Sequence, residues 1–170
     1  MKSSLSVTVS LLFLLLITGC GTTNQYVRVP NQSRVVDDQG KGRIYVIGQP
    51  FAINIMSHNK NMRVTDGGEL IGSIVGRGYL CWERPPGIAT ITSEAASSPY
   101  GSVITLPVER GKAHYVFAHI GPKWSAWMFL MFLVPEWLRA HDLDLAVRLE
   151  VVTEDRGKAA LARSNPPEQK

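Results

Sequence analysis

Hydrophobic and polar residues alternate in short runs over most of the chain from residue 43 to residue 152. A period of two places one apolar face against a core and one polar face in water, which is typical of a half-buried β-strand. The most regular run is at residues 143–151, where Leu or Val takes every second position. The other runs that predict strands cover residues 43–47, 51–56, 69–74, 79–83, 88–93, 102–108 and 114–119.

Tight-turn residues separate these runs. Asp66-Gly67-Gly68, Pro85-Pro86-Gly87 and Gly111-Lys112 each fall between two apolar runs, and such clusters favour reversals of the chain. Short strands at this spacing predict a mainly β fold with a single β-sandwich domain over residues 43–163. At the end of this domain, residues 154–163 are predicted to form a short C-terminal helix. Residues 164–170 predict a disordered tail.

Residues 1–19 have the composition of a secretory signal peptide. Lys2 precedes an apolar run at residues 11–17 that is too short to span a bilayer, and small residues follow the run. The step Ile17-Thr18-Gly19-Cys20 resembles the lipobox of bacterial lipoproteins. That resemblance implies cleavage before Cys20, diacylglycerol on the Cys20 sulfur and an acyl chain on the new amino terminus. The alternatives are an ordinary cleaved signal or a single membrane helix.

Lipid on Cys20 predicts a stable anchor in a bilayer, because each buried methylene contributes about 0.8 kcal/mol and several acyl chains bury many. Gly21 stands where an aspartate tends to retain lipoproteins at the inner membrane of a double-membraned cell. We therefore expect the periplasmic face of the outer membrane. Residues 20–42 are polar and predict a tether between the lipid and the domain. No cofactor other than the lipid is expected.

Composition narrows the classes of partner. The chain has 18 basic and 14 acidic residues and a formal net charge of +4, which is too small and too scattered to favour nucleic acid. The roughly 150 residues after the signal suffice for one domain with its own core. If Cys20 carries lipid, Cys81 has no intramolecular disulfide partner. A small buried thiol is expected there, and a reactive thiol is the alternative.

The sequence does not contain the motifs of common catalytic sites. Gly72-Ser73-Ile74-Val75-Gly76 places its serine beside the first glycine, so it does not match the nucleophile elbow G-x-S-x-G. His141, Asp142 and Asp144 place two carboxylates beside an imidazole. That set could hold a metal or an acid/base pair, and a solvated strand start is the alternative. We expect no enzyme activity.

Two further pairs of polar residues bear on possible chemistry. His114 and His119 are an odd number of residues apart, so one regular strand points them to opposite faces and they cannot share a metal ion. Glu83 and Arg84 precede the double proline and are predicted to be ordinary surface charges.

Residues 124–138 form the most apolar segment after the signal, with Lys123 and Arg139 on either side. As a helix the segment measures about 22 Å, which is shorter than the core of a bilayer. Tryptophan near both ends, next to cations, suits a membrane interface. The alternatives are a helical or loop element of the core and an interface with lipid or an envelope protein. The candidate contact residues are Trp124, Trp127, Phe129, Phe132 and Trp137.

An ordered series of short motifs resembles a family of small bacterial lipoproteins that carry a β-sandwich domain of unknown function. The resemblance implies a prealbumin-like or carboxypeptidase-regulatory-like sandwich and no known activity. Gly68-Glu69 and the apolar character of residues 124–138 depart from that pattern. The series consists of Arg43-Ile44-Tyr45-Val46, Asp66-Gly67, Leu70-Ile71-Gly72, Gly78-Tyr79, Pro86-Gly87, Gly111-Lys112 and His114-Tyr115-Val116.

These features predict a lipid-anchored module of the cell envelope with a structural or binding role and without catalysis. Its expected partner is the bilayer, through Cys20. The first alternative is an envelope assembly or transport accessory that holds a lipid or a hydrophobic client through residues 124–138. The second is a hydrolase or metal-dependent enzyme built on His141, Asp142 and Asp144.

Overall fold

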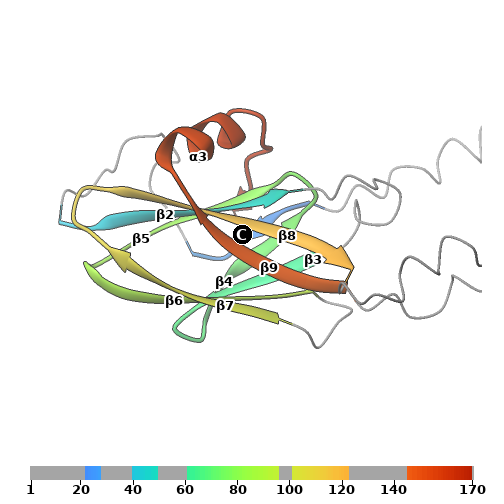
Figure 1. The fold of residues 1–170 in the computed structure, drawn as a ribbon, viewed down its shortest axis with the longest axis horizontal. Coiled ribbons are helices and arrows are strands. Elements are labelled where there is room, and N and C mark those ends of the chain that lie inside the picture. The colour runs from blue at the N-terminus through green and yellow to red at the C-terminus, as the bar shows by residue number, and fades with distance from the viewer. Residues whose placement is uncertain (1–21, 28–39, 50–60, 96–100, 123–144, 170) are drawn as a thin grey trace, which may run out of the picture.

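Two β-sheets pack face to face in the computed structural model of the chain (Figure 1). The structure describes residues 22–27, 40–49, 61–95, 101–122 and 145–169. The strand order is β10-β1-β4-β3-β6-β7 in the six-stranded sheet and β5-β2-β8-β9 in the four-stranded sheet. The predicted β-sandwich is confirmed. The strands are β1 (Asn24–Gln25), β2 (Gly42–Gln49), β3 (Asn61–Asp66), β4 (Glu69–Val75), β5 (Tyr79–Arg84), β6 (Gly87–Ala95), β7 (Gly101–Val108), β8 (Ala113–Pro122), β9 (Leu145–Val152) and β10 (Glu168–Gln169).

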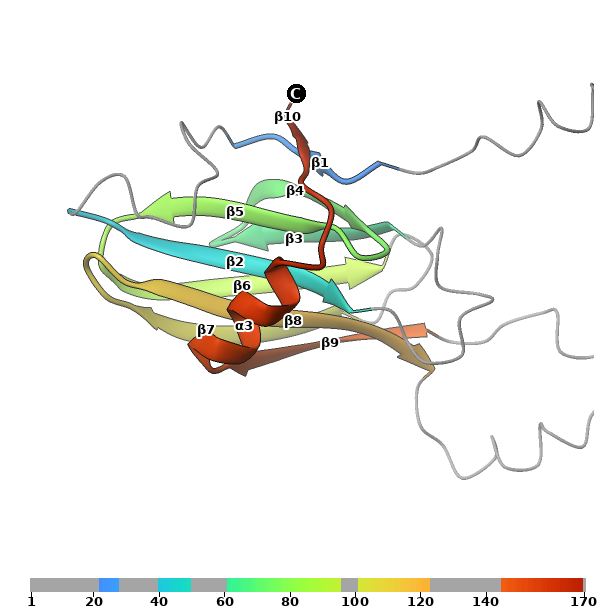
Figure 2. The same cartoon turned by 90° about the horizontal axis from the view of Figure 1, so that it is seen from above.

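β2 lies inside the four-stranded sheet, antiparallel to β5 and parallel to β8. It is buried along nearly its whole length, because both of its faces are covered. Ile44 and Val46 belong to the core, and the helix α3 (Glu154–Leu161) packs over the opposite face, across β2 and β8 (Figure 2). A continuous apolar run is the sequence signature of a strand buried on both sides.

The six-stranded sheet shows the alternation that its sequence predicts. In β6, Ala89, Ile91, Ser93 and Ala95 are buried, and the residues between them are more accessible to solvent. The predicted turn between β3 and β4 has Gly67 at φ 57° and Gly68 at φ 90°. These are left-handed conformations that glycine adopts without steric cost.

The predicted C-terminal helix is confirmed as α3, but the residues after it differ from the predicted tail. Glu168 and Gln169 form β10, which pairs in parallel with Asn24 and Gln25 of β1. The Glu168 N–H donates to the Thr23 carbonyl at 2.8 Å. Glu168 and Gln169 form a strand because they pair with the main chain of β1, and composition alone does not reveal such an edge.

The first described residues also differ from the predicted tether over 20–42. Residues 22–27 include β1, which lies between β4 and β10 and pairs antiparallel with Ser73 and Gly72 of β4. Polar composition suggested a solvated linker, yet Thr23 and Gln25 are buried and their side chains hydrogen-bond to Val75 and Cys81 of the sandwich. The domain therefore begins about twenty residues earlier than its first apolar run indicates.

Candidate functional site

The segment that follows Cys20 is fastened to the sandwich by Thr23. Its side chain is only 7% exposed, and its Oγ1 accepts a hydrogen bond from the Val75 N–H at 3.0 Å. The same hydroxyl lies 3.4 Å from the Val75 carbonyl, to which it donates. Gly78 leaves room for Thr23, since a Cβ on Gly78 would overlap the threonine side chain.

Gln25 provides the second attachment of β1. Its side chain is 1% exposed. The Oε1 accepts the Cys81 main-chain N–H at 3.0 Å, and the Nε2 donates to the Val27 carbonyl at 2.8 Å. Both ends of the amide are therefore satisfied in a buried setting, which is the condition for burying such a group without a large penalty. Three peptide units span at most about 11 Å, so Cys20 lies within that reach of Thr23.

The chain enters the sandwich at one end, which we call the anchor end. Thr23 lies beside Val75, where β4 ends, and Asn61 at the start of β3 pairs with Val75. The Gly48 N–H donates to the Gly78 carbonyl at 2.9 Å, which brings the last residues of β2 to the same place. β8 runs parallel to β2, and Pro122 at its end pairs with Leu145 at the start of β9. The described residues that mark the anchor end are Thr22, Gln49, Asn61, the turn 76–78, Ala95, Gly101, Pro122 and Leu145.

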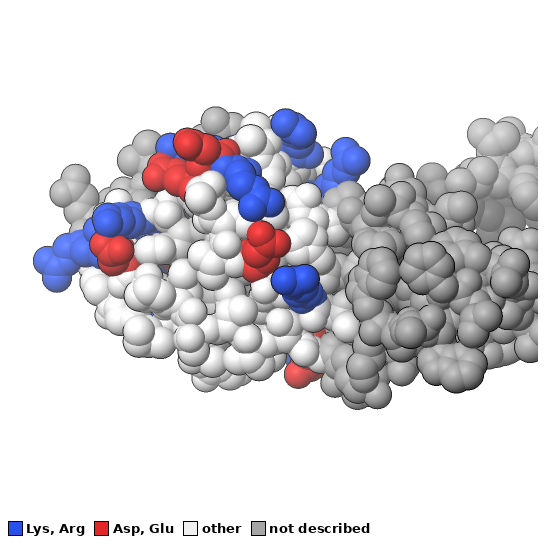
Figure 3. Space-filling view, viewed as in Figure 1, with Lys and Arg blue, Asp and Glu red and all other residues white. Residues whose placement is uncertain are grey.

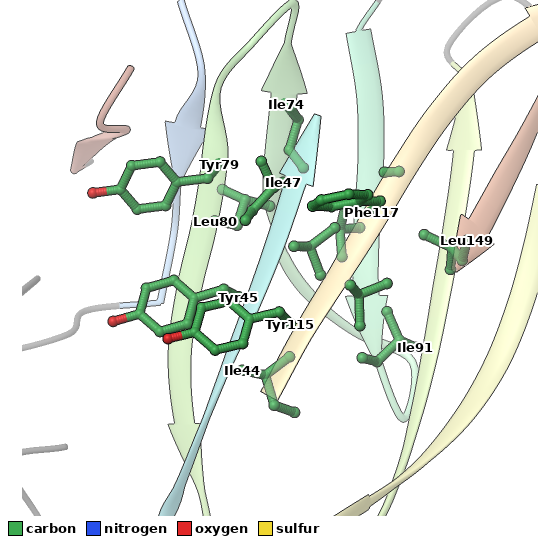
Figure 4. Packing of buried hydrophobic residues seen from close by; sticks show 14 of the residues in the cluster. Ile44, Tyr45, Ile47, Ile74, Tyr79, Leu80, Ile91, Tyr115, Phe117 and Leu149 are labelled. Carbon is green, nitrogen blue, oxygen red and sulfur yellow. The ribbon is translucent and has the colours of Figure 1, made fainter. Parts of the chain in front are cut away.

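A buried charged and aromatic cluster lies on the outer face of the four-stranded sheet. We call Arg43, Tyr45, Glu83 and Tyr115 the Arg43 cluster. Arg43 Nη2 and Glu83 Oε1 are 2.6 Å apart, and Arg43 Nη1 donates to the Tyr45 hydroxyl at 3.4 Å. The Tyr45 and Tyr115 rings stack at 5.1 Å between centroids. Figure 4 shows Tyr45, Tyr79 and Tyr115 on one side of the sheet and the core residues Ile91 and Leu149 on the other.

The ionisation of the Arg43 cluster follows from its burial. Burial alone would lower the pKa of Arg43, but its hydrogen bonds with Tyr45 and Glu83 outweigh burial and raise it. Burial also raises the pKa of the Tyr45 phenol, and the cationic Arg43 only partly opposes that shift. The cluster therefore holds a cation and a neutral phenol across the ordinary range of pH. Its close packing suits a structural role.

The prediction that Glu83 and Arg84 are ordinary surface charges is wrong. Glu83 pairs with the buried Arg43, and Arg84 Nη1 lies 2.6 Å from Asp66 Oδ1. The other Asp66 oxygen accepts the indole N–H of the buried Trp82 at 2.9 Å. Both residues are partly buried because the facing strands place opposite charges next to them, which the sequence around each residue does not show.

His114 and His119 both lie on β8. The His114 imidazole accepts the Glu109 N–H at 3.1 Å, whereas His119 lies 3.5 Å from Glu150. Burial lowers the pKa of both imidazoles. The predicted burial of the Cys81 thiol is confirmed, since its residue is fully shielded from solvent.

The remaining predicted site residues lie outside the described part of the chain. They are Cys20, Trp124, Trp127, Phe129, Phe132, Trp137, His141, Asp142 and Asp144. Within the described ranges, no group of three His, Cys, Asp or Glu side chains is placed to hold a metal ion. Among the same residues, no helix has the length and apolar character needed to cross a membrane.

Thr23 and Gln25 are the residues of this site that sequence reasoning missed. They lie in a polar segment whose composition resembles that of a linker, and the two residues of β1 are too few to show a strand period. The signal that could have found them is their position directly after the lipidation motif. No family model matches this chain, and no curated protein or solved structure matches it either.

Proposed function

We propose that this protein is a lipid-anchored β-sandwich of the bacterial cell envelope that acts as a structural or binding module. Ile17-Thr18-Gly19-Cys20 is the sequence basis of the anchor. The observation that carries the proposal is the docking of β1. Thr23 and Gln25 are hydrogen-bonded into the sandwich almost immediately after Cys20. A lipid on that cysteine therefore holds a folded domain at the membrane surface.

The structural arrangement supports a firm attachment. A long flexible linker lets a domain explore a wide shell around its anchor. Here the reach between Cys20 and Thr23 is about 11 Å at most, so the position of the lipid and the position of the domain are closely coupled. We place the protein at the periplasmic face of the outer membrane because Gly21 follows the cysteine. The resemblance to small β-sandwich lipoproteins supports the same class.

Cys20→Ser tests the anchor, and Cys81→Ala is its matched control because these are the two cysteines of the chain. Bacteria that express each variant are fed labelled palmitate, and their membranes are separated from the soluble fraction. We expect the wild type and Cys81→Ala to carry the label and sediment with membranes. Cys20→Ser should lack the label and remain an uncleaved precursor.

Two results would contradict the proposal. One is label that persists in Cys20→Ser, since this would place the lipid elsewhere. The other is a wild-type protein without label in the soluble fraction, since this would remove the anchor. Circular dichroism of each purified variant shows whether the β-sheet signal is retained, so that a folding defect is not mistaken for loss of lipid.

A further inference from the structure

We infer that two copies of this chain join edge to edge through β7 (Gly101–Val108), antiparallel around a twofold axis, so that their six-stranded sheets become one continuous sheet. The partner is thus a second copy of the same strand. Such a contact goes beyond the proposed lipid anchor, and neither of the two requires the other.

The main chain of β7 has hydrogen-bonding groups that point away from β6. The Gly67 N–H donates to the Thr90 carbonyl at 2.9 Å, so Thr90 turns its main-chain groups toward the side of β3. Thr105 lies opposite Thr90, and in an antiparallel pair opposite residues either bond to each other or both point away. Thr105 therefore directs its N–H and carbonyl to the outside of the sheet. The period of two gives Val103 and Pro107 the same direction.

The outward edge of β7 is open. Among the described residues, none is hydrogen-bonded to its outward main-chain groups. Val103 is 61% exposed, and Thr105 and Pro107 are exposed as well. Proline is tolerated in a sheet where its missing N–H would have faced solvent, which agrees with Pro107 at this edge. β9 comes close to β7 but meets a side chain, because the Leu149 N–H donates to the Ser102 Oγ at 3.2 Å. The edge can therefore accept another strand.

The other three sheet edges are protected within the described residues. β10 has only two residues. On β5, the Cys81 N–H is bonded to the Gln25 side chain, and β9 carries the charged Arg148 and Glu150. Short strands, covering groups and charges are common means by which proteins prevent pairing at a sheet edge. β7 has eight residues, no charge and a single proline near its end.

A second copy of β7 fits this edge group by group. A twofold axis beside Ile104 places Val103 opposite Thr105 of the partner subunit, and each donates its N–H to the carbonyl of the other. Gly101 then donates to the carbonyl of Pro107 of the partner subunit, so the residue without an N–H serves as an acceptor. Every outward N–H of one strand meets a carbonyl of the other. A twofold contact of this kind is closed and stops at two copies.

The lack of charge on β7 favours a copy of itself as the partner. A twofold axis brings the residues near it close to their own copies, and like charges that face each other destabilise a sheet. β7 has no charged residue between Gly101 and Val108. The part of the surface where Figure 1 places β7 is largely white in Figure 3, that is, without charged side chains. The β-branched Val103 and Thr105 are also of the type that pairs well across strands.

Val103→Lys tests the contact, and Ile88→Lys is its matched control. Both positions carry exposed branched side chains on the same face of the sheet, 61% and 65% exposed, but Ile88 lies on β6, one strand inside the edge. Val103→Pro is a second variant that adds no charge. It removes an N–H that points outward, so the ladder between β6 and β7 should survive. Circular dichroism checks that each variant keeps its β-sheet signal.

Light scattering and sedimentation measure the oligomeric state of the purified full-length chain, with the same detergent for every variant. An interface of one strand edge is small, so the range runs from about 1 μM to about 1 mM protein. We expect dimers of the wild type and of Ile88→Lys. Val103→Lys and Val103→Pro should raise the dissociation constant at least about tenfold, because the twofold axis doubles the effect of each substitution.

Cross-linking in cells identifies the occupant of the edge. Diagonal neighbours on paired strands are about 7–8 Å apart, so a short bis-maleimide should join Val103→Cys to its own copy. Ile88→Cys should give no such product beyond the wild-type background, because three strand spacings of about 4.8 Å separate the two copies of Ile88. Cys81 is fully buried.

Four results would overturn the inference. They are a wild type that is monomeric over the whole range, a Val103→Lys dimer as stable as the wild type, a Val103→Pro variant that loses its β-sheet signal, and a cross-link from position 103 to a different protein without a self-dimer. None of these results bears on the lipid at Cys20, which is measured separately by the palmitate label.

Discussion

Gln25 and Cys81 connect the two sheets of the sandwich, because the Gln25 Oε1 accepts the main-chain N–H of Cys81 at 3.0 Å. β5, which carries Cys81, is an edge strand of the four-stranded sheet. Edge strands present unpaired main-chain groups that can recruit other chains. Here a side chain from β1 covers part of that edge, so the segment nearest the anchor also protects the fold.

Gln25→Leu should therefore destabilise the protein. Leucine keeps most of the volume but leaves the Cys81 N–H buried without an acceptor, which costs about 1–3 kcal/mol. Urea unfolding followed by circular dichroism measures the change. Tyr26→Ser is the control, because Tyr26 is 47% exposed and such substitutions usually change stability by about 0.5 kcal/mol or less. Equal midpoints for the two variants would show that the Gln25 hydrogen bond does not support the fold.

Glu83→Gln should lower stability more than an ordinary surface substitution. It removes the negative charge of the Glu83 carboxylate, which lies 2.6 Å from Nη2 of the fully buried Arg43, and removing one partner of a buried ion pair costs up to about 3–5 kcal/mol. Glu109→Gln is the matched control, because Glu109 pairs with Lys112 in an exposed turn and should leave the unfolding midpoint unchanged. If both variants unfold at the same urea concentration, the Arg43 cluster is not a stabilising element.

Local periodicity predicts much of this fold. β2, β6 and the regular run of β9 are visible as apolar patterns, and α3 lies within the helix predicted over residues 154–163. β1 could not be predicted in this way, because two residues show no period and its stability comes from side-chain hydrogen bonds to distant strands. β10 depends on β1 and was missed with it.

The candidate site depends on register, which the sequence does not display. In the sequence, Arg43 is the polar first residue of an apolar run. Its ion-pair partner Glu83 lies opposite it because the antiparallel register of β2 and β5 pairs Arg43 with Glu83. The anchor end likewise requires the parallel pairing of β2 with β8, which brings Gln49 and His119 to the same level. By contrast, the burial of Cys81 follows from its apolar neighbours.

Alkaline pH should weaken the fold through Tyr45 and Tyr79. Burial raises the pKa of both phenols above the ordinary value of about 10. The unfolded chain then loses these protons at lower pH than the folded chain does. Their contribution is complete below about pH 10 and is lost as the pH rises toward the folded-state values.

Urea unfolding at a series of alkaline pH values, with tyrosinate absorbance recorded in parallel, checks this expectation. The unfolding midpoint should fall over the window in which tyrosinate appears. Tyr45→Phe should reduce the slope of that decline, although it also removes the hydroxyl that accepts from Arg43. An unchanged slope in Tyr45→Phe would rule Tyr45 out as a source of the alkaline loss.

Gly157→Ala should destabilise the protein, opposite to the usual effect in a helix. Alanine ordinarily favours a helix over glycine by about 1 kcal/mol. In α3, however, Gly157 is buried directly against Tyr115, and a Cβ at this position would overlap the Tyr115 side chain. Overpacking of this kind costs about 1–3 kcal/mol, so the contact should outweigh the helix preference and shift α3 away from β8.

Thermal unfolding of four proteins checks the assignment: wild type, Gly157→Ala, Tyr115→Leu and the double variant. If the Tyr115 ring is the obstacle, Gly157→Ala should cost less in the Tyr115→Leu background, because the smaller side chain gives part of the space back. Ala159→Gly, at an exposed position of α3, serves as the control for helix preference and should lose about 1 kcal/mol. A stabilising Gly157→Ala would mean that α3 does not pack on Tyr115, and the cover over the outer face of β2 and β8 would have to lie elsewhere.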